Sequence, residues 1–333
     1  MTDGSTARPR VLSGIRPTGE SFQLGNYLGA VRHWTAMQDE NECFFFLADL
    51  HALIDVPDPA RLRSRTRESV AELLAMGVDP DRSAVFVQSH RPEHPELAWL
   101  LGCLTGFGEA SRMTQFKEKG GGTVGLFTYP VLQAADILMY QADAVPIGED
   151  QRQHLELTRD LATRFNSRYG ATFTLPAAYA GRAAARIKDL QDPLRKMSKT
   201  LGGAGTIWVL DEPAAITKKV KGAVTDTGRE VRAGDDKPGV TNLLTILSAA
   251  TGRPVSDLET EYDGKGYGDF KADVAEALVE MFAPVRRRYA ELIADPGHLD
   301  DVLVDGAERA GRVAAQTMAV VRERVGLLGP RAG

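Results

Sequence analysis

The chain has 333 residues, of which 43% are hydrophobic and 26% charged, and this length predicts about two globular domains. Average glycine and proline contents argue against collagen-like and disordered classes. No apolar stretch approaches the ~20 residues of a membrane span. A net charge of −5 taken alone argues against a nucleic-acid partner. The only two cysteines, Cys43 and Cys103, exclude a disulfide scaffold and cannot supply four thiolates to a zinc or iron–sulfur site, so we expect a reduced, cytoplasmic protein.

The first half of the chain alternates predicted strands with predicted helices. Residues 1–10 lack the apolar core of a secretory signal, and we expect a flexible tail there. Continuous apolar runs predict buried strands at 11–13, 43–47, 84–87 and 144–147. Apolar residues at helical spacing predict helices that begin near Tyr27 and cover 67–76. This alternation indicates a parallel α/β sheet.

The second half of the chain is predicted to be mostly helical. Helical spacing continues over 151–170, where it marks a helix ended by a glycine, and again over 274–292 and 302–320. The glycine-rich stretch 201–205 is the expected boundary between a catalytic domain over 11–200 and a helical domain over 205–299. We expect the last helix, about 300–330, to pack back on the first domain.

Positive charge is concentrated in one segment of the chain. Residues 151–200 contain 10 lysines and arginines against 4 acidic residues, a net charge of +6. A solvated helix face would account for this excess, and so would an anionic partner such as a nucleotide or a polynucleotide. The overall acidity of the chain therefore does not exclude such a partner.

A glycine-rich loop follows the first predicted strand. It reads Ser-Gly-Ile-Arg-Pro-Thr-Gly-Glu-Ser-Phe-Gln-Leu-Gly-Asn over residues 13–26 and leads into a helix. Glycines let the backbone approach a ligand closely, and a helix N-terminus offers free N–H groups to phosphate. Such a loop also occurs as a simple turn, so spacing and context decide between the two interpretations.

A second loop combines two lysines with glycines. Lys196-Met-Ser-Lys-Thr200 precedes the glycine-rich stretch, and two lysines three residues apart can close on a polyphosphate. A solvated lysine pair is the simpler interpretation of this pentapeptide taken alone.

Together the two loops resemble the signatures of the class I aminoacyl-tRNA synthetases. Gln23-Leu-Gly-Asn26 is similar to a degraded HIGH motif, and residues 196–200 are similar to KMSKS. Other segments resemble the bacterial tryptophanyl-tRNA synthetases, and the resemblance covers the chain from about residue 11 to the last helix. These segments are RMTQFKEK (112–119), TYPVLQAAD (128–136), GEDQRQH (148–154), AVTD (223–226), KPG (237–239) and GKGYGDFK (264–271).

The resemblance implies a Rossmann-like catalytic domain that activates L-tryptophan with ATP and Mg²⁺ and transfers it to tRNA(Trp). Magnesium would be held by the nucleotide, with no zinc and no iron–sulfur cluster. The implied ATP-binding residues are Arg16, Pro17, Thr18, Gly25, Asn26, Gly148, Glu149, Asp150, Ile187 through its backbone, Lys196, Met197, Ser198, Lys199 and Thr200. Lys196 and Lys199 would meet the pyrophosphate, Gln23 would donate to phosphate, and Lys117 would add a charge unless it is an ordinary surface lysine.

The resemblance also places an amino-acid site around Asp136, whose matching carboxylate in the family accepts the indole N–H. A buried acceptor of this kind rejects ligands that lack the donor; the simpler interpretation is an aspartate near a helix N-terminus. Tyr129 and Gln151 match positions near the ammonium group, and His51 matches a histidine near the indole, although a strand-end histidine is often structural. Further residues expected to line this pocket are Leu12, Gly14, Gln133, Val145 and Ile147.

Three residues depart from the family pattern in this pocket. Arg16 stands where glutamine is common, Gln133 where many relatives have methionine, and Leu12 where phenylalanine is common. Their clustering suggests an auxiliary or inhibitor-resistant form of the enzyme. Gln23 in place of the first HIGH histidine weakens that motif without abolishing it.

The second domain resembles the family's helical anticodon-binding domain, and the family is a homodimer. Basic residues that would contact tRNA phosphates, or simply form solvated helix faces, are Lys218, Lys219, Lys221, Arg286, Arg287 and Arg288. Two alternatives to a tryptophan enzyme stay open. One is a tyrosyl-type synthetase on the same scaffold, and the other is a weakly active paralogue that binds a regulatory partner.

Overall fold

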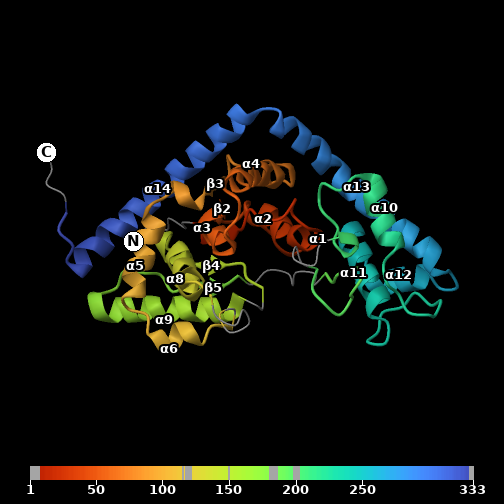
Figure 1. Cartoon of the computed structure of the whole chain (residues 1–333), viewed down its shortest axis with the longest axis horizontal. Helices are drawn as coiled ribbons and strands as arrows, with labels where there is room; N and C mark the ends of the chain where they lie inside the picture. Colours follow the sequence, from red (N-terminus) through yellow and green to blue (C-terminus); the bar gives the residue numbers. More distant parts are fainter. Residues whose placement is uncertain are drawn as a thin grey trace, which may run out of the picture.

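The computed structural model of the chain describes residues 8–114, 116, 122–148, 151–179, 187–197 and 203–329. At its centre lies a parallel five-stranded sheet in the order β3-β2-β1-β4-β5 (Figure 1). The strands are β1 (Arg10–Ile15), β2 (Glu42–Leu47), β3 (Ser83–Val87), β4 (Ala144–Val145) and β5 (Ala177–Ala178). The predicted parallel α/β fold is confirmed.

Alternate residues of the central strands enter two different apolar cores. Val11, Phe45 and Val85 point to one side of the sheet, whereas Phe44 and Phe86 point to the other. Both faces of a parallel sheet are covered, so each strand reads as a continuous apolar run instead of an alternating one. The two short strands lack this signal: β5 was not predicted because its two alanines are exposed, and β4 stops before Pro146, which has no N–H to pair.

Several helices begin earlier than the apolar spacing predicts. The helix expected near Tyr27 starts at Leu24 and runs through α1 (Leu24–Asn26), a π-helical turn (Tyr27–Val31) and α2 (Arg32–Met37). α4 (Pro59–Ala75) starts eight residues before the predicted 67. The Asp58 side chain accepts a hydrogen bond from the Arg61 N–H at 2.9 Å and caps α4, and such caps are independent of apolar periodicity.

Helices cover both faces of the sheet. α2 and α4 pack on one face, and α5 (Glu93–Gly102), α8 (Val124–Met139) and α9 (Arg152–Tyr169) pack on the other. The remaining helices of the first half are α3 (Asp49–Ala52) and α6 (Phe107–Ser111). Short 3-10 turns cover Leu53–Asp55, Gln88–His90 and Gly203–Gly205.

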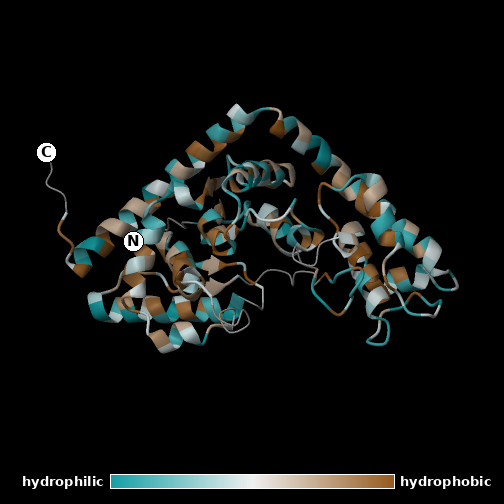
Figure 2. Cartoon of the chain, viewed as in Figure 1, coloured by the Kyte–Doolittle hydropathy of each residue, from teal (hydrophilic) through white to brown (hydrophobic). Residues whose placement is uncertain are grey.

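The second half contains only helices and loops apart from a single bridge at Trp208, over residues 206–329, all of which are described. Its helices are α10 (Pro213–Lys221), α11 (Pro238–Thr251), α12 (Val255–Glu261), α13 (Tyr267–Ile293) and α14 (Pro296–Val325). α13 and α14 form the two arms of an arch that meet above α4 (Figure 1). Both arms carry apolar residues between polar ones (Figure 2), as expected of helices with one buried face.

The apolar core on the α4 side of the sheet continues without a break into α10, α11 and α13. The division into domains at 11–200, with the last helix returning to it, and 205–299 therefore stays a prediction. α14 packs against β3, the edge strand, and it approaches so closely that a Cβ atom at Gly306 would lie 1.8 Å from the carbonyl oxygen of Val85. The Arg309 guanidinium donates to the carbonyl oxygens of Pro80 and Ser83 beside this contact.

Candidate active site

The predicted site residues gather at the carboxyl ends of the parallel strands. Arg16 follows β1, His51 lies just beyond β2, Gln88 follows β3 and Ile147 lies just beyond β4. β1 lies between β2 and β4, so the strand order reverses direction at this point of the sheet. Ligands of open α/β sheets bind at such a reversal, outside the carboxyl ends of the strands.

Asp136 is the centre of a buried polar cluster at this edge. It lies in the interior of α8, not at a helix N-terminus, and its side chain is only 2% exposed. Its Oδ2 atom lies 2.8 Å from His51 Nε2, and its Oδ1 atom lies 2.6 Å from His94 Nδ1 and 2.7 Å from Gln88 Nε2. Three side chains from three different segments therefore converge on one carboxylate.

The His94 ring connects Asp136 to Tyr140. Its Nε2 atom lies 2.8 Å from the Tyr140 hydroxyl, and its Nδ1 atom faces the carboxylate. A neutral imidazole satisfies both contacts when Nδ1 carries the proton and Nε2 accepts from the tyrosine. Burial opposes ionisation of Asp136, but the hydrogen bonds from His51 and His94 outweigh it and lower the pKa of the carboxyl group to about 2. Asp136 is thus a pure hydrogen-bond acceptor at neutral pH.

His94 and Gln88 were not identified from the sequence. His94 is fully buried among Phe46, Phe86 and Tyr140, with ring centroids 5.5 to 6.2 Å away. A lone histidine in a helix gives little signal by itself. Its position just after a strand end, close behind Gln88, was the one indication available.

Tyr129 and Gln151 meet at a third histidine, His154. The Tyr129 hydroxyl lies 3.1 Å from His154 Nε2, and His154 Nδ1 lies 2.8 Å from Gln151 Oε1. The Tyr129 ring also meets the His51 ring edge-on at 5.8 Å. The two residues expected near a ligand ammonium group are therefore brought together, and they adjoin the Asp136 cluster through His51.

The remaining residues of the predicted amino-acid pocket lie on β1, on α8 and beyond β4. Leu12 and Val145 are buried in the same apolar core as Phe44 and Phe46. Gln133 and Ile147 are half-buried. A Cβ atom on Gly14 would lie 2.4 Å from the Phe46 ring, so this position of β1 has no room for a side chain.

The loop after β1 contains the residues expected to bind ATP. Arg16 is half-exposed and forms an ion pair with Asp55 at 3.0 Å, Pro17 is buried and Thr18 is half-buried. Gly19 has a φ of 84°, in the left-handed region that favours glycine, and turns the chain toward α1.

The Gln-Leu-Gly-Asn tetrad forms the cap of the helix that follows. The Gln23 N–H donates to Asn26 Oδ1 at 3.2 Å. The Gln23 side chain is buried, and its Oε1 atom has no hydrogen-bond partner. A buried amide oxygen without a partner is costly, and a ligand can supply the missing donor.

The loop 196–200, called the lysine segment below, begins in a short hairpin. Lys188 pairs with Lys196 in an antiparallel bridge, and the Met197 N–H donates to the Ile187 carbonyl at 3.1 Å. Ile187 and Met197 are both buried in the core on the α4 side. The hairpin therefore fixes the positions of Lys196 and Met197, the first two residues of the segment.

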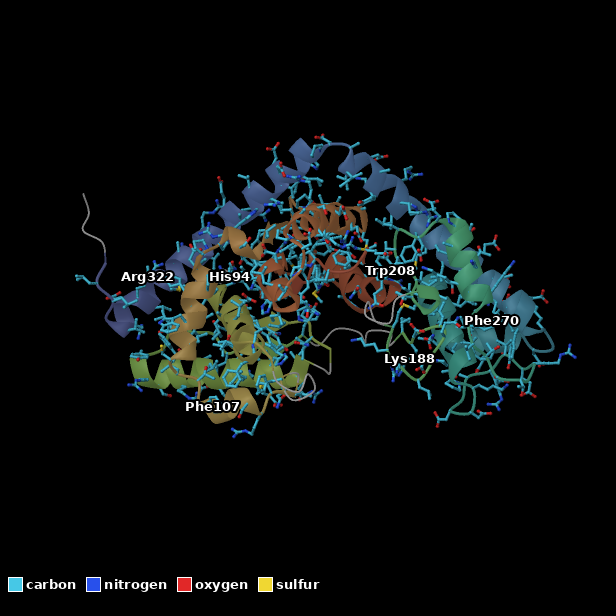
Figure 3. The ribbon with its side chains drawn as sticks, viewed as in Figure 1. His94, Phe107, Lys188, Trp208, Phe270 and Arg322 are labelled. Carbon is cyan, nitrogen blue, oxygen red and sulfur yellow. The ribbon has the colours of Figure 1, made fainter. Side chains whose placement is uncertain are left out.

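The hairpin is tied to the helical half by Asn242 of α11. Its Oδ1 accepts from the Lys188 N–H at 2.8 Å, and its Nδ2 donates to the Lys188 carbonyl at 2.9 Å. Lys188 and Trp208 lie where the sheet-bearing half meets α10–α12 (Figure 3). One amide side chain thus satisfies both backbone groups of a residue at the base of the lysine segment.

The end of the glycine-rich loop pairs with a segment that follows the 196–200 loop in the chain. The Leu24 N–H donates to the Ile207 carbonyl at 2.9 Å, and the Val209 N–H donates to the Phe22 carbonyl at 2.8 Å. Residues 22–24 therefore pair with residues 207–209. This pairing joins the glycine-rich loop to the start of the helical half.

Six of the predicted site residues lie outside the described residues, and nothing is concluded about their positions. They are Lys117, Glu149, Asp150, Ser198, Lys199 and Thr200. Among the residues that are described, no cluster of histidine, cysteine, aspartate and glutamate could hold a metal ion. The same described part contains no helix long and apolar enough to cross a membrane.

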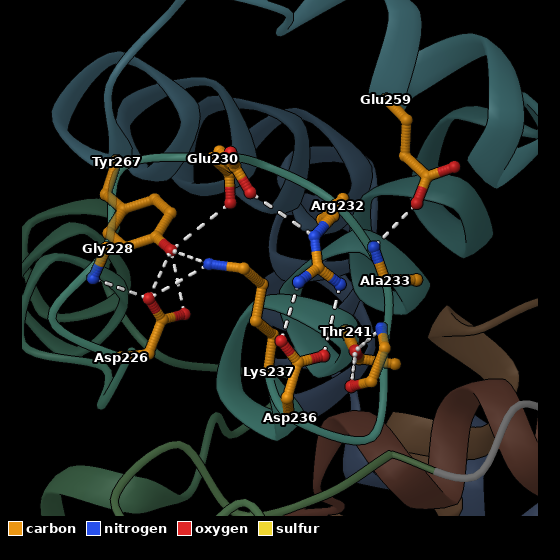
Figure 4. A network of polar contacts seen from close by, with 11 residues as sticks. Asp226, Gly228, Glu230, Arg232, Ala233, Asp236, Lys237, Thr241, Glu259 and Tyr267 are labelled. Carbon is orange, nitrogen blue, oxygen red and sulfur yellow. Dashed lines mark hydrogen bonds and ion pairs between the residues drawn. The ribbon is translucent and has the colours of Figure 1, made fainter.

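Three motifs of the second half converge on one polar cluster (Figure 4). The Lys237 ammonium lies 3.0 Å from Asp226 Oδ1 and 3.0 Å from the Tyr267 hydroxyl, which itself lies 2.7 Å from Asp226 Oδ2. A Cβ atom on Gly239 would lie 2.0 Å from the Val224 carbonyl oxygen, which explains the glycine of the Lys-Pro-Gly motif. These motifs shape the 223–238 loop.

The basic residues expected to contact RNA fall into two groups. Lys219 and Arg286 both bind Asp211, the lysine through Nζ to Oδ2 at 2.6 Å and the arginine to the backbone carbonyl at 3.3 Å. Lys218, Lys221 and Arg287 are exposed, and Arg288 forms an exposed ion pair with Glu291. Three of the six basic residues therefore have partners within the protein.

Comparison with known proteins identifies relatives over the whole chain. The profile of the family described as tRNA synthetases class I (W and Y) matches residues 5–283. The chain is 56% identical to "Tryptophan--tRNA ligase 2" of Streptomyces avermitilis, over 96% of this chain and 98% of that protein. It is 51% identical to "Tryptophan--tRNA ligase" of Leifsonia xyli, over 99% of both.

Solved structures agree with these sequence relatives. The tryptophanyl-tRNA synthetase of Mycoplasma pneumoniae superposes with a TM-score of 0.89 at 37% identity, over 96% of this chain and 98% of that one. The Campylobacter jejuni enzyme, solved in complex with ADP and tryptophan, superposes with a TM-score of 0.82 at 33% identity, over 96% and 100% of the two chains.

The lowered pKa of Asp136 predicts a pH-dependent contribution to stability. A carboxyl group with a folded-state pKa of about 2 and an ordinary unfolded value stabilises the fold above about pH 4 and loses this effect as the pH falls toward 2. We expect Asp136→Asn to lower the free energy of unfolding at neutral pH. The difference in this free energy between the unmodified protein and the variant should shrink by on the order of 2 kcal/mol as the pH falls from 5 to 2. Urea titrations at a series of pH values measure this gap, and parallel stability curves would contradict the assignment.

Proposed function

The chain belongs to the tryptophan and tyrosine group of class I tRNA synthetases, and from this premise we propose that it acts as a tryptophan–tRNA ligase. The reaction has two steps. The tryptophan carboxylate attacks the α-phosphorus of ATP to give tryptophanyl-adenylate and pyrophosphate, and the acyl group then passes to a terminal ribose hydroxyl of tRNA(Trp) with release of AMP. The single observation that carries the proposal is the ionised acceptor Asp136, buried among His51, His94 and Gln88 at the carboxyl ends of the strands.

Selection of tryptophan is assigned to Asp136. His51, His94 and Gln88 occupy three of the roughly four lone-pair positions of its carboxylate. The remaining position would accept the indole N–H, and an amino acid without a donor there would leave a buried charge under-satisfied. Further residues proposed to line the amino-acid pocket are Leu12, Gly14, Tyr129, Gln133, Val145, Ile147 and Gln151.

Activation of the carboxylate is assigned to positioning and to charge stabilisation. Lys196 and Lys199 would neutralise the leaving pyrophosphate, with Lys117 as a third charge, and Gln23 would donate to phosphate. Magnesium would arrive with ATP, bound to its phosphates. The proposed nucleotide contacts are Arg16, Pro17, Thr18, Gly25, Asn26, Gly148, Glu149, Asp150, Ile187, Met197, Ser198 and Thr200.

We assign tRNA binding to the helical half, over 205–299, and catalysis to 11–200 with the returning C-terminal helix. Lys218, Lys221 and Arg287 are the exposed basic residues of the set and are the proposed phosphate contacts. A reaction that consumes tRNA and ATP, together with two free cysteines, supports a cytoplasmic location.

A homodimer is proposed from an exposed apolar surface. Trp99 of α5, Phe107 of α6 and Val124 at the start of α8 are 74%, 79% and 78% exposed. Large apolar side chains gathered at neighbouring helices mark protein–protein contacts, and tryptophan is enriched at the energetic centres of such contacts. We propose that a second copy of the chain covers this surface.

We further propose that the chain is an auxiliary, inhibitor-resistant form. The three departures from the family pattern, at Leu12, Arg16 and Gln133, are all at positions expected near one pocket, and the relative from Streptomyces avermitilis bears the number 2 in its name. Gln133 puts a polar amide where a methionine thioether would contact the indole face of an inhibitor.

The function is tested by exchange of labelled pyrophosphate into ATP. We expect exchange that depends on tryptophan and not on tyrosine. Lys196→Ala should reduce it by about 10²-fold or more, because a charge that stabilises the leaving pyrophosphate is lost. Lys188→Ala is the matched control, since the Leu194 carbonyl is the one partner of its ammonium group among the described residues. Exchange with tyrosine alone would identify the tyrosyl alternative, and no exchange with either would favour a regulatory paralogue.

The dimer is tested by sedimentation equilibrium. The unmodified protein should have twice the mass of one chain, and Trp99→Glu should shift it toward monomers, because it buries a charge in the contact. Val224→Glu is the control, as Val224 is partly exposed in the 223–238 loop of the helical half, on no element of the patch. A monomeric unmodified protein would overturn the proposal.

Inhibitor resistance is tested with an indole-based tryptophan analogue. Gln133→Met should increase inhibition by about tenfold while changing the KM for tryptophan less, since the methionine restores apolar contact with the analogue. Equal inhibition of this chain and of an enzyme with the common glutamine and methionine would contradict the idea.

A further inference from the structure

A second buried carboxylate lies on the opposite side of the sheet from Asp136. Glu72 of α4 is fully buried, and its Oε1 atom lies 3.0 Å from the Arg65 guanidinium, which is also buried. Arg65 donates further to Ser69 Oγ at 3.1 Å and to Glu68 Oε2 at 2.7 Å. One oxygen of Glu72 is thus committed to its own helix.

The other oxygen of Glu72 holds the glycine-rich loop. Oε2 accepts the Ser21 hydroxyl at 2.6 Å and the Phe22 N–H at 2.7 Å. Both residues are buried, and they directly precede Gln23, the residue proposed to donate to phosphate. A single carboxylate thereby sets the position of the last loop residues before the capping tetrad.

The same segment is held from the other direction by the chain that follows the lysine segment. The Phe22 N–H is bound by Glu72, while its carbonyl accepts from Val209. A shift of Phe22 would therefore also move residues 207–209, its pairing partners.

This network is not explained by stability alone. Removing a glutamate and an arginine from water is expensive, and apolar residues of similar volume are often at least as stabilising. What the carboxylate adds is a directional contact to two donors of a loop that has no regular secondary structure.

We propose that Glu72 is a positioning residue of the nucleotide site, acting through Ser21 and Phe22 to hold Gln23 in place for the phosphates of ATP. The inference rests on the proposed function in so far as the glycine-rich loop binds ATP. Asp136 and its partners lie in the other core of the sheet. Loss of the Glu72 contact should therefore weaken ATP binding and leave tryptophan binding nearly unchanged.

Two serines of the network provide a matched pair of variants. Ser21→Ala removes the hydroxyl that binds Glu72 from the loop, whereas Ser69→Ala removes one that binds Arg65 within α4. Both hydroxyls are buried, so both variants should lose comparable thermal stability. Only Ser21→Ala should raise the KM for ATP, by about tenfold, with a change below about twofold in the KM for tryptophan.

Calorimetric titration with ATP gives a readout that does not require turnover. The Kd for ATP should rise about tenfold in Ser21→Ala and stay within about twofold in Ser69→Ala. Absence of exchange in the unmodified protein would refute the proposed function, while the titrations would still decide the inference. Equal affinities for ATP in the two variants would overturn the positioning role of Glu72. A loss of affinity in Ser21→Ala that is as large for tryptophan as for ATP would overturn it as well. Should Ser21→Ala fail to fold, Ser21→Cys keeps the shape of the side chain with a weaker donor and carries the same test.

Discussion

A parallel sheet has to be covered on both faces, and this constraint organises the whole chain. It places helices on both sides of β1, β2 and β3, and it collects the strand ends at one edge, where loops from both sides meet. The two faces of the sheet differ in the polar residues that they position. The α8 side holds the acceptor Asp136 with its histidines, and the α4 side holds the glycine-rich loop through Glu72.

Each face contains a buried carboxylate that is surrounded by hydrogen-bond donors. On the α8 side the donors are side chains, and one acceptor position remains for a ligand. On the α4 side two of the donors belong to a loop, and the carboxylate fixes the backbone. Low polarity around each group makes these contacts strong and makes an unpaired partner costly. Both carboxylates have these partners without a ligand, and under the proposed function this reduces the ordering needed when the substrates bind.

Sequence patterns predicted much of this arrangement but not its contacts. The strands at 43–47 and 84–87 follow from apolar runs, and Asp136 and Lys196 were identified through motifs. His94 and Glu72 were not, because a single polar residue in a helix gives no periodic signal. Their importance comes from partners 42 and 50 residues away in the chain, His94 with Asp136 and Glu72 with Phe22. The early start of α4 was missed because Asp58 begins it by a local side-chain contact.

The close contact between α14 and β3 has a consequence for synthesis of the chain. β3 leaves the ribosome more than 200 residues before Gly306, which lies against its backbone. For most of elongation the sheet therefore has an open edge strand, the kind of surface that pairs with other chains. Translation has to outpace such pairing, or a chaperone has to shield residues 83–87, until the last helix arrives. A message truncated before α14 would yield a chain that retains most of the proposed site and lacks this cover.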